Sequence, residues 1–377
     1  MSLTATPHSP GQSPVPYERA GSALVRPAAP FWRTADFWLA LLARASAVLV
    51  LVMLATLVSV LLYSAAGAIK TYGLSILTGT EWRPNEREIT EVTTRVNDDG
   101  EVERLVKVLQ TLPPKFGALP AIYGTAISSL IALVFAVPLS FGAALFLVRM
   151  APRWIATPVS FLIEFLAAIP SIAYGLWGLF VLSPFLLNHV LTPLRNLFGT
   201  TPGLAWLFSS HTQVGQRTVE VHYATGNNLL TAGVILAIMV VPIITAVSRD
   251  ILKTVPRVQI EGTLALGATW WQSCMEMIRY SRSALFGAVM LGLARAAGET
   301  MAVTMVIGNA MDIRPSPFAP SQTMSALLAN EFAESNNDLH LSALKMVAVS
   351  LLLMSLLFNV VARWLVVGGN SRSAAAH

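Results

Sequence analysis

Six long apolar runs constrain this chain more than any other feature. They cover residues 37–63, 120–148, 158–184, 229–248, 284–308 and 343–367. A helix needs roughly 20 apolar residues to cross about 30 Å of hydrocarbon, and each run is long enough. Only 12% of the residues are charged, whereas an average soluble domain has about 25%. We therefore expect an all-α polytopic membrane protein with six transmembrane helices.

These runs also set the expected domain organisation. Residues 1–33 are rich in Pro, Ser and Ala and lack an apolar core, so we expect a disordered cytoplasmic tail and not a cleavable signal. The expected regions are the tail 1–33, a first transmembrane helix 34–63, an external loop 64–119, a core 120–367 with helices two to six, and a cytoplasmic tail 368–377. The single cysteine, Cys274, excludes an intrachain disulfide and is expected to pack inside the fold.

The external loop 64–119 contains a hairpin pattern. Ile89–Val96 and Glu101–Val108 are rich in strand-forming residues and flank an Asp99-Gly100 pair. Such a pair between two such arms predicts a small β-hairpin, within an insert at about 86–112. Because an isolated hairpin is marginally stable, it should lean on other structure. It is either a solvated decoration or a docking surface for an external partner.

Two later loops are expected on the same side. Loop 185–228 is polar, and its three histidines have no metal-ligand spacing. We therefore expect no metal in this loop. We expect no cofactor for the chain either. Loop 309–342 is expected to hold a short helix at 322–334.

Basic residues predict the orientation. Arginines and lysines gather before the first run, between the second and third, between the fourth and fifth, and after the sixth. Loops rich in Lys and Arg stay in the cytoplasm. Both termini are therefore predicted to be cytoplasmic.

Arg295 and Glu299 place two opposite charges in the fifth run. Residues four apart share one face of a continuous helix, and a charge in hydrocarbon is costly unless it is paired or faces a protein interior. Small residues at Gly292, Ala294 and Gly298 allow another helix to approach closely. The two charges are either a structural ion pair or part of a path for an anion, with Arg295 attracting it and Glu299 preventing tight binding.

Three further polar residues lie at or near the ends of runs. Glu164 is either an interfacial residue or a buried partner for a basic residue. Arg249 and Asp250 end the fourth run, where an arginine can extend to the interface. Pro170 and Gly175 interrupt the third run, which predicts a broken helix of the kind that often marks transporter substrate sites.

The cytoplasmic loop at about 249–283 is predicted to form two short helices. The first contains Glu261, and Gly267 can supply the left-handed residue that ends it. Trp270 and Trp271 then begin a second, amphipathic helix. The pair is either a helix on the membrane surface or a hook for a cytoplasmic partner.

This loop resembles the coupling loop of ABC importer permeases. Their motif is Glu-Ala-Ala, three residues, Gly, about nine residues, then Ile-x-Leu-Pro; Glu261 and Gly267 keep the Glu-to-Gly spacing. Gly262 and Thr263 replace the two alanines, and Met277–Tyr280 replaces the final motif. The resemblance implies that the ATPase-coupling residues are Glu261, Gly262, Thr263, Ala265 and Gly267.

Stretches across the spans resemble the permeases of phosphate ABC importers more specifically. They are Ile122–Thr125, Ala136–Leu147, Glu164–Ser171, Tyr174–Gly178, Ala232–Met239, Arg249–Asp250, Gly292–Asn309 and Ala329–Glu334. The stretches follow the same order over about 120–340, and neither the hairpin nor the N-terminal tail is part of the resemblance.

The resemblance implies a non-enzymatic permease subunit of an ATP-driven importer of inorganic phosphate, with a six-helix type I importer fold, in the bacterial inner membrane. Its implied partners are a sister permease in a heterodimer, two cytoplasmic ATP-binding subunits and an external phosphate-binding protein. The chain has no Walker A pattern Gly-x4-Gly-Lys-Ser/Thr, so the ATPase is expected to be another subunit.

Three alternatives remain open at the level of sequence. The chain could carry another oxyanion, such as molybdate or sulfate. It could be a secondary transporter in which Arg295 and Glu299 relay protons, although the helix–Gly–helix loop argues against this. It could also be a subunit that reports phosphate status without transporting it.

Overall fold

The computed structural model describes residues 35–96, 102–199, 201, 203–214, 217–223, 225–335 and 337–374. The expected N-terminal tail and residues 375–377 of the expected C-terminal tail lie outside these residues. The chain divides into two compact units, Met1–Val58 and Ser59–His377. The described part of the first unit is the beginning of helix α1, Ala35–Tyr72, whose last residues belong to the second unit.

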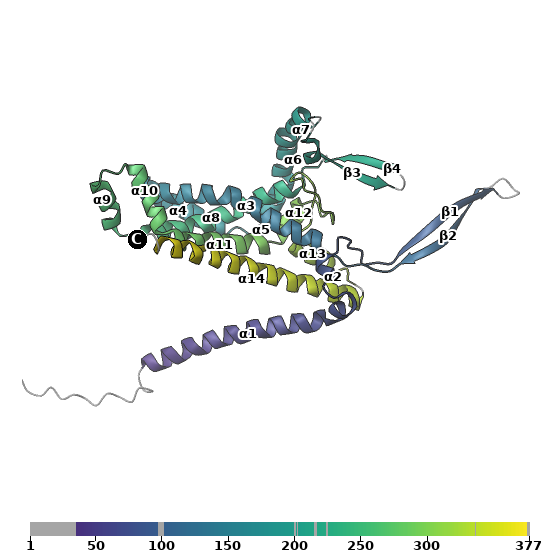
Figure 1. The fold of residues 1–377 in the computed structure, drawn as a ribbon, viewed down its shortest axis with the longest axis horizontal. Coiled ribbons are helices and arrows are strands. Elements are labelled where there is room, and N and C mark those ends of the chain that lie inside the picture. Colours follow the sequence, from purple (N-terminus) through teal and green to yellow (C-terminus); the bar gives the residue numbers. More distant parts are fainter. Residues whose placement is uncertain are drawn as a thin grey trace, which may run out of the picture. The chain divides into compact units, whose positions relative to one another are not determined.

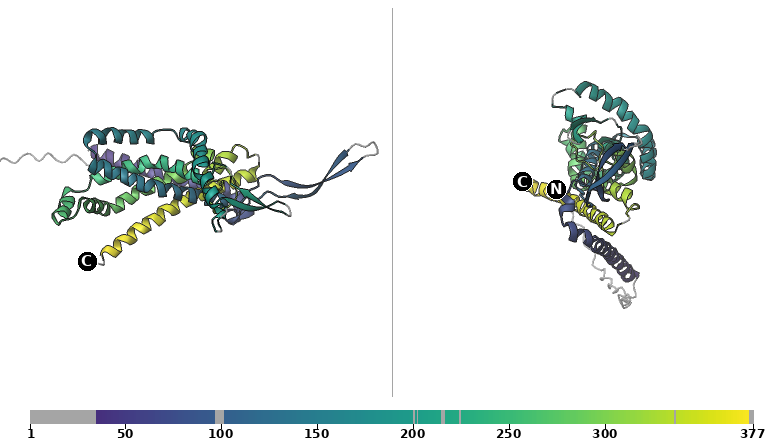
Figure 2. Two further views of the ribbon diagram at one scale, coloured as in Figure 1. Left: turned by 90° about the horizontal axis from the view of Figure 1, so that it is seen from above. Right: turned by 90° about the vertical axis from the view of Figure 1, so that its right-hand side faces the viewer.

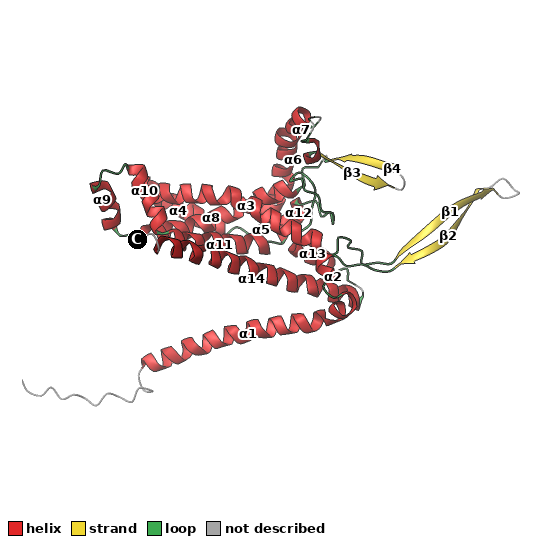
Figure 3. Cartoon of the chain, in the orientation of Figure 1, coloured by secondary structure: helices red, strands yellow, loops and turns green. Residues whose placement is uncertain are grey.

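The second unit is mainly helical, with two small sheets (Figure 3). Its elements before the fourth predicted span are α2 Ser75–Thr78, β1 Arg87–Val96, β2 Val102–Leu112, α3 Leu119–Leu145, α4 Arg153–Ala167, α5 Ser171–Trp177, α6 Ser183–Leu186, α7 Thr192–Phe198, β3 Ser209–Val214 and β4 Arg217–His222. The later elements are α8 Leu229–Lys253, α9 Arg257–Ala265, α10 Trp270–Tyr280, α11 Arg282–Gly298, α12 Met301–Val306, α13 Met324–Glu331 and α14 Asp338–Ala374. Wider π-helical turns continue α3 over Phe146–Met150 and join α5 to α6 and α6 to α7.

Five helical segments among the described residues are long and apolar enough to cross a membrane. They are Phe37–Tyr72, Leu119–Met150, Ser171–Phe198, Leu229–Lys253 and Asp338–Val361. Four of them coincide with predicted runs, but the predicted spans 158–184 and 284–308 are not single helices. The first of these spans is interrupted between α4 and α5, where Pro170 cannot continue a helix; this confirms the predicted break, although Gly175 lies inside α5 and does not interrupt it. The second span is interrupted at Glu299.

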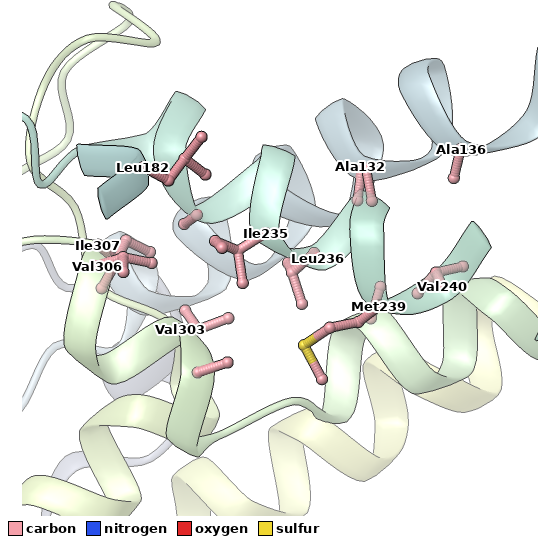
Figure 4. Packing of buried hydrophobic residues seen from close by; sticks show 14 of the residues in the cluster. Ala132, Ala136, Leu182, Ile235, Leu236, Met239, Val240, Val303, Val306 and Ile307 are labelled. Atoms are coloured by element: carbon pink, nitrogen blue, oxygen red, sulfur yellow. The ribbon is translucent and has the colours of Figure 1, made fainter. Parts of the chain in front are cut away.

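The centre of the second unit is a close contact of α3, α8 and α11. Figure 4 shows side chains of α3, α8 and α12 meeting around Ile235, Leu236 and Val303, and Ala288 and Ala296 of α11 belong to the same cluster. Glycines permit this approach, because a Cβ on Gly233 would lie 2.4 Å from Ile131 and one on Gly292 would lie 2.6 Å from Ile244. Small residues at helix contacts are typical of membrane proteins, where van der Waals packing replaces much of the hydrophobic drive.

A second cluster joins the end of α1 to α13 and α14. Ala65, Ala68, Met324 and Leu344 are fully buried in it. The Ser342 hydroxyl accepts a hydrogen bond from the Ala68 backbone N–H at 2.9 Å and donates one to the Ser64 carbonyl at 3.1 Å. Residues 59–72 are thereby fixed to α14 within the second unit.

Two antiparallel hairpins emerge from the second unit, at the end opposite α9 and α10 (Figures 1 and 2). The β1–β2 hairpin occupies the predicted place, with Val96 opposite Val102; the predicted turn at 97–100 lies outside the described residues. The β3–β4 hairpin, with Val214 opposite Arg217, was expected to be polar loop. Its strands are only six residues long and mostly polar, so their alternation is a weak signal.

Candidate functional site

The charged fifth run is broken at its acidic residue. Helix α11 ends at Gly298, Glu299 has an extended backbone (φ −71°, ψ 129°), and α12 begins at Met301. The Glu299 carbonyl, released from the helical ladder, accepts a 2.7 Å hydrogen bond from the Ser325 hydroxyl. The expectation that Arg295 and Glu299 share one continuous helical face is therefore wrong, because the break redirects the chain between them.

The two charged side chains have different environments. Glu299 is only 8% exposed, whereas Arg295 lies on the exposed side of α11. Within the described part of the chain, neither side chain makes an ion pair, with the other or with any other residue. The structural ion pair considered from the sequence is thus absent from the described residues.

Arg295 cannot face lipid without cost. It lies about 20 Å from the start of α11, at 1.5 Å per residue. The Arg295 side chain is therefore far from the membrane surface at that end of the helix. The exposed side of α11 around it is formed by small or apolar residues: Ala284, Gly287, Leu291, Ala294 and Gly298. An unpaired cation on such a surface points to water, a bound anion or another protein chain.

Lys345 is a functional candidate that the sequence analysis missed. It lines a cavity of about 580 Å³ together with Gly298, Thr300 and Ser325, next to the break. It is partly buried in α14 and has no acidic partner among the described residues. The available signal was a lysine near the start of the long apolar run 343–367, whose other charged residue is Arg363 near its end.

Glu164, Arg249 and Asp250 form one network at the end of α8. Arg249 Nη2 lies 3.0 Å from Glu164 Oε1 on α4 and 2.9 Å from Asp250 Oδ1. Lys253 Nζ approaches the same Asp250 oxygen at 3.7 Å. The Arg249 side chain is 10% exposed and both carboxylates are more than half exposed. Arg249 is thus a buried cation with two partners and does not extend freely to the interface.

The predicted helix–Gly–helix loop is present between α8 and α11 (Figure 1). Gly267 has φ +83°, the left-handed conformation that was expected of it. Thr269 and Gln272 form a reciprocal capping box at the start of α10. The Thr263 hydroxyl lies 3.3 Å from the Ser273 hydroxyl and links the two helices.

Only one helix of this loop has a buried face. Cys274 and Met277 of α10 pack against Leu252 and Leu285, so Cys274 is a packing residue as expected. Helix α9 buries no residue, and Glu261 and Gly262 are exposed. Leu266 is 90% exposed beside it. Val258 and Leu264 of α9 are exposed as well, and a group of neighbouring exposed apolar residues is typical of a protein contact surface.

Known proteins resemble this chain in sequence and, more weakly, in structure. Residues 136–367 match the family described as binding-protein-dependent transport system inner membrane component. The phosphate transport system permease protein PstC of Mesorhizobium japonicum is 40% identical, covering 88% of this chain and 90% of that protein. The PstC protein of Xylella fastidiosa strain 9a5c is 38% identical, covering 87% and 90%. A solved inward-facing MetNI methionine ABC transporter covers 67% of this chain and 94% of its own at 18% identity and a TM-score of 0.43.

Proposed function

The chain belongs to the binding-protein-dependent transport system inner membrane components, among the phosphate transport permeases, and on this premise we propose that it builds half of a phosphate path. It is a non-catalytic, multi-pass protein of the inner membrane. The single observation that carries phosphate as the substrate is the near full-length match to PstC permeases. The other half of the path would come from a sister permease, giving a type I importer with six membrane-spanning segments in each subunit.

Five of the six proposed membrane-spanning segments are the long helical segments described above. The remaining one is the predicted run 284–308, which is divided into α11 and α12. Helix α11 has 17 residues, and the break at Glu299 separates it from α12. Non-helical backbone at membrane depth is tolerated where it is buried in protein or lines a water-filled cavity. The break at Glu299 and the neighbouring cavity meet this condition.

Arg295 and Glu299 are proposed to have opposite effects on the anion. The exposed Arg295 would attract phosphate toward the subunit contact. Glu299 would repel it, so that the anion is not held tightly. Lys345 adds a second cation beside the break. The absence of an internal partner for Arg295 among the described residues supports this assignment over a structural ion pair.

The two ends of the second unit suit different partners. Exposed α9, with Glu261, Gly262, Thr263, Ala265 and the turn at Gly267, is proposed to contact one of two cytoplasmic ATP-binding subunits. The opposite end, which carries both hairpins, is proposed to face the external phosphate-binding protein (Figure 1). With that orientation both termini are cytoplasmic, as the basic loops predict. We propose the same division of the chain that the sequence predicts: two cytoplasmic tails, a first transmembrane helix, the external loop 64–119 and the core 120–367.

The experiment is radiolabelled phosphate uptake in cells that lack their own phosphate importer. The cells would express this chain with its sister permease, ATPase and binding protein, and matched cells would lack only this chain. We expect uptake that depends on this chain and is not reduced by excess sulfate or molybdate. Competition by either oxyanion would favour the broader-substrate alternative, and verified assembly without uptake would favour the signalling alternative.

A further inference from the structure

A second cavity lies beside the Arg249 network, between α4 and α8, and several charged and hydroxyl side chains line it. Its volume is about 360 Å³, within the range of about 300–1,000 Å³ that is usual for ligand pockets. The residues that matter for its chemistry are Arg153, Thr157, Ser160, Phe161, Arg249 and Lys253. It shares no lining residue with the cavity beside the break at Glu299.

The cavity has an uncompensated positive charge. Arg249 is balanced by Glu164, which also lines the cavity, and by Asp250, which is shared with Lys253. No carboxylate of the described residues lies within ion-pair distance of Arg153. The lining therefore offers a free guanidinium and a weakly paired ammonium to an anion.

Hydroxyl groups lie on the same side of α4 as this guanidinium. Thr157 and Ser160 follow Arg153 at spacings of four and seven residues, which places all three on one helical face. Neither hydroxyl has a hydrogen-bond partner among the residues that the structure describes. The first turn of α4 also lacks a side-chain cap. Cations, hydroxyls and a helix N-terminus together form a donor set that suits a phosphate group.

The surroundings of the cavity favour a phosphate attached to an apolar molecule. Phe161 lines the cavity and is 66% exposed, and Trp154 and Phe165 are exposed on the same helix. With 15 residues, α4 is about 22 Å long, shorter than the hydrocarbon core. A short amphipathic helix with a basic start suits the membrane interface, where anionic headgroups gather.

We propose that the cavity between α4 and α8 binds the phosphate group of an anionic phospholipid, with Arg153, Thr157, Ser160 and Lys253 as its donors. The acyl chains then lie along the exposed aromatic residues of α4. The bound headgroup would join α4 to α8 at the point where Glu164 already contacts Arg249. The proposal is independent of the direction and the substrate of transport.

The test is native mass spectrometry of the purified full-length permease in lipid-depleted detergent. Phosphatidylglycerol is titrated against diacylglycerol with the same chains, which lacks the phosphate. We expect Arg153→Gln to weaken phosphatidylglycerol binding about tenfold, as expected for one charge-assisted contact. Arg257→Gln, an exposed cation at the start of α9 outside the cavity, is the matched control and should leave binding unchanged.

A second variant keeps the test valid if Arg153→Gln alters the fold. Thr157→Val with Ser160→Ala retains every charge and should also weaken phosphatidylglycerol binding, with little change in diacylglycerol binding. Equal phosphatidylglycerol binding by the wild type and both cavity variants would overturn the proposal. Diacylglycerol binding as tightly as phosphatidylglycerol would overturn it too. Displacement of the lipid by inorganic phosphate, dependent on Arg153, would assign the cavity to the free anion and contradict the lipid assignment.

Discussion

The Ser325 hydroxyl donates a 2.7 Å hydrogen bond to the carbonyl of Glu299, the residue at which α11 ends. Ser325 belongs to α13, 26 residues further along the chain. The bond satisfies a buried carbonyl that a continuous helix would have paired with its own backbone. It therefore stabilises the break that gives Glu299 a direction different from that of Arg295.

Replacing Ser325 should weaken this break. Ser325→Ala removes the donor and leaves the Glu299 carbonyl buried, which costs about 1–3 kcal/mol. We expect a lower unfolding temperature of the purified permease and reduced phosphate uptake. Ser355→Ala is the control, because that hydroxyl donates a 3.0 Å hydrogen bond to the Leu351 carbonyl within its own helix. Equal stability and uptake in the two variants would show that the bond does not maintain the break.

Alanine substitution at two glycines of α11 should change the stability of the permease in opposite directions. A Cβ on Gly292 would lie 2.6 Å from Ile244 and 2.7 Å from Val240, whereas a Cβ on Gly287 would meet nothing within 4 Å. Gly292→Ala should destabilise the permease by about 1–3 kcal/mol through overpacking. Gly287→Ala should stabilise it slightly, by up to about 1 kcal/mol, since Ala is the better helix former. Thermal unfolding of the two purified variants measures the difference, and a Gly292→Ala variant as stable as Gly287→Ala would contradict the packing of α11 on α8.

The loop that contains α9 and α10 offers a similar contrast. Gly267 has φ +83°, so Gly267→Ala is strained by about 1 kcal/mol or more. We expect it to shift α9 and to lower uptake while the subunits still assemble. Gly262 lies within α9 with open space around its Cα, and Gly262→Ala restores a residue of the resembling motif. Uptake should survive Gly262→Ala, and loss of uptake in both variants or in neither would argue against a specific role for the turn.

The membrane class and most of the spans could be predicted from the sequence because they depend on long apolar runs. The turn at Gly267 could be predicted because a left-handed residue at a helix end has a strong local preference. The break at Glu299 could not, because Gly298 is tolerated within a helix and the decisive bond comes from Ser325 in a later segment. Lys345 was missed for a similar reason, since only the packing of α14 places it beside that break.

The sequence alone leaves open whether Glu164 is an interfacial residue or the partner of a basic residue. The packing of the helices pairs it with Arg249. The two residues are 85 positions apart, and no sequence pattern sets the register between the third and fourth runs. The contact forms because α4 packs beside the end of α8. Since the Glu164 carboxylate is 57% exposed, the pair is expected to add only about 0–1 kcal/mol of stability.

The central claim is that the separated charges Arg295 and Glu299 act on the transported anion and do not serve only to maintain the fold. The most direct measurement is radiolabelled phosphate uptake by complexes carrying Arg295→Gln or Glu299→Gln, each with verified subunit assembly. Arg195→Gln in α7 is the control for loss of a cation elsewhere. We predict that each site variant lowers uptake roughly tenfold or more, equivalent to about 1.4 kcal/mol, while assembly and the control stay normal. Normal uptake by both site variants would contradict the account.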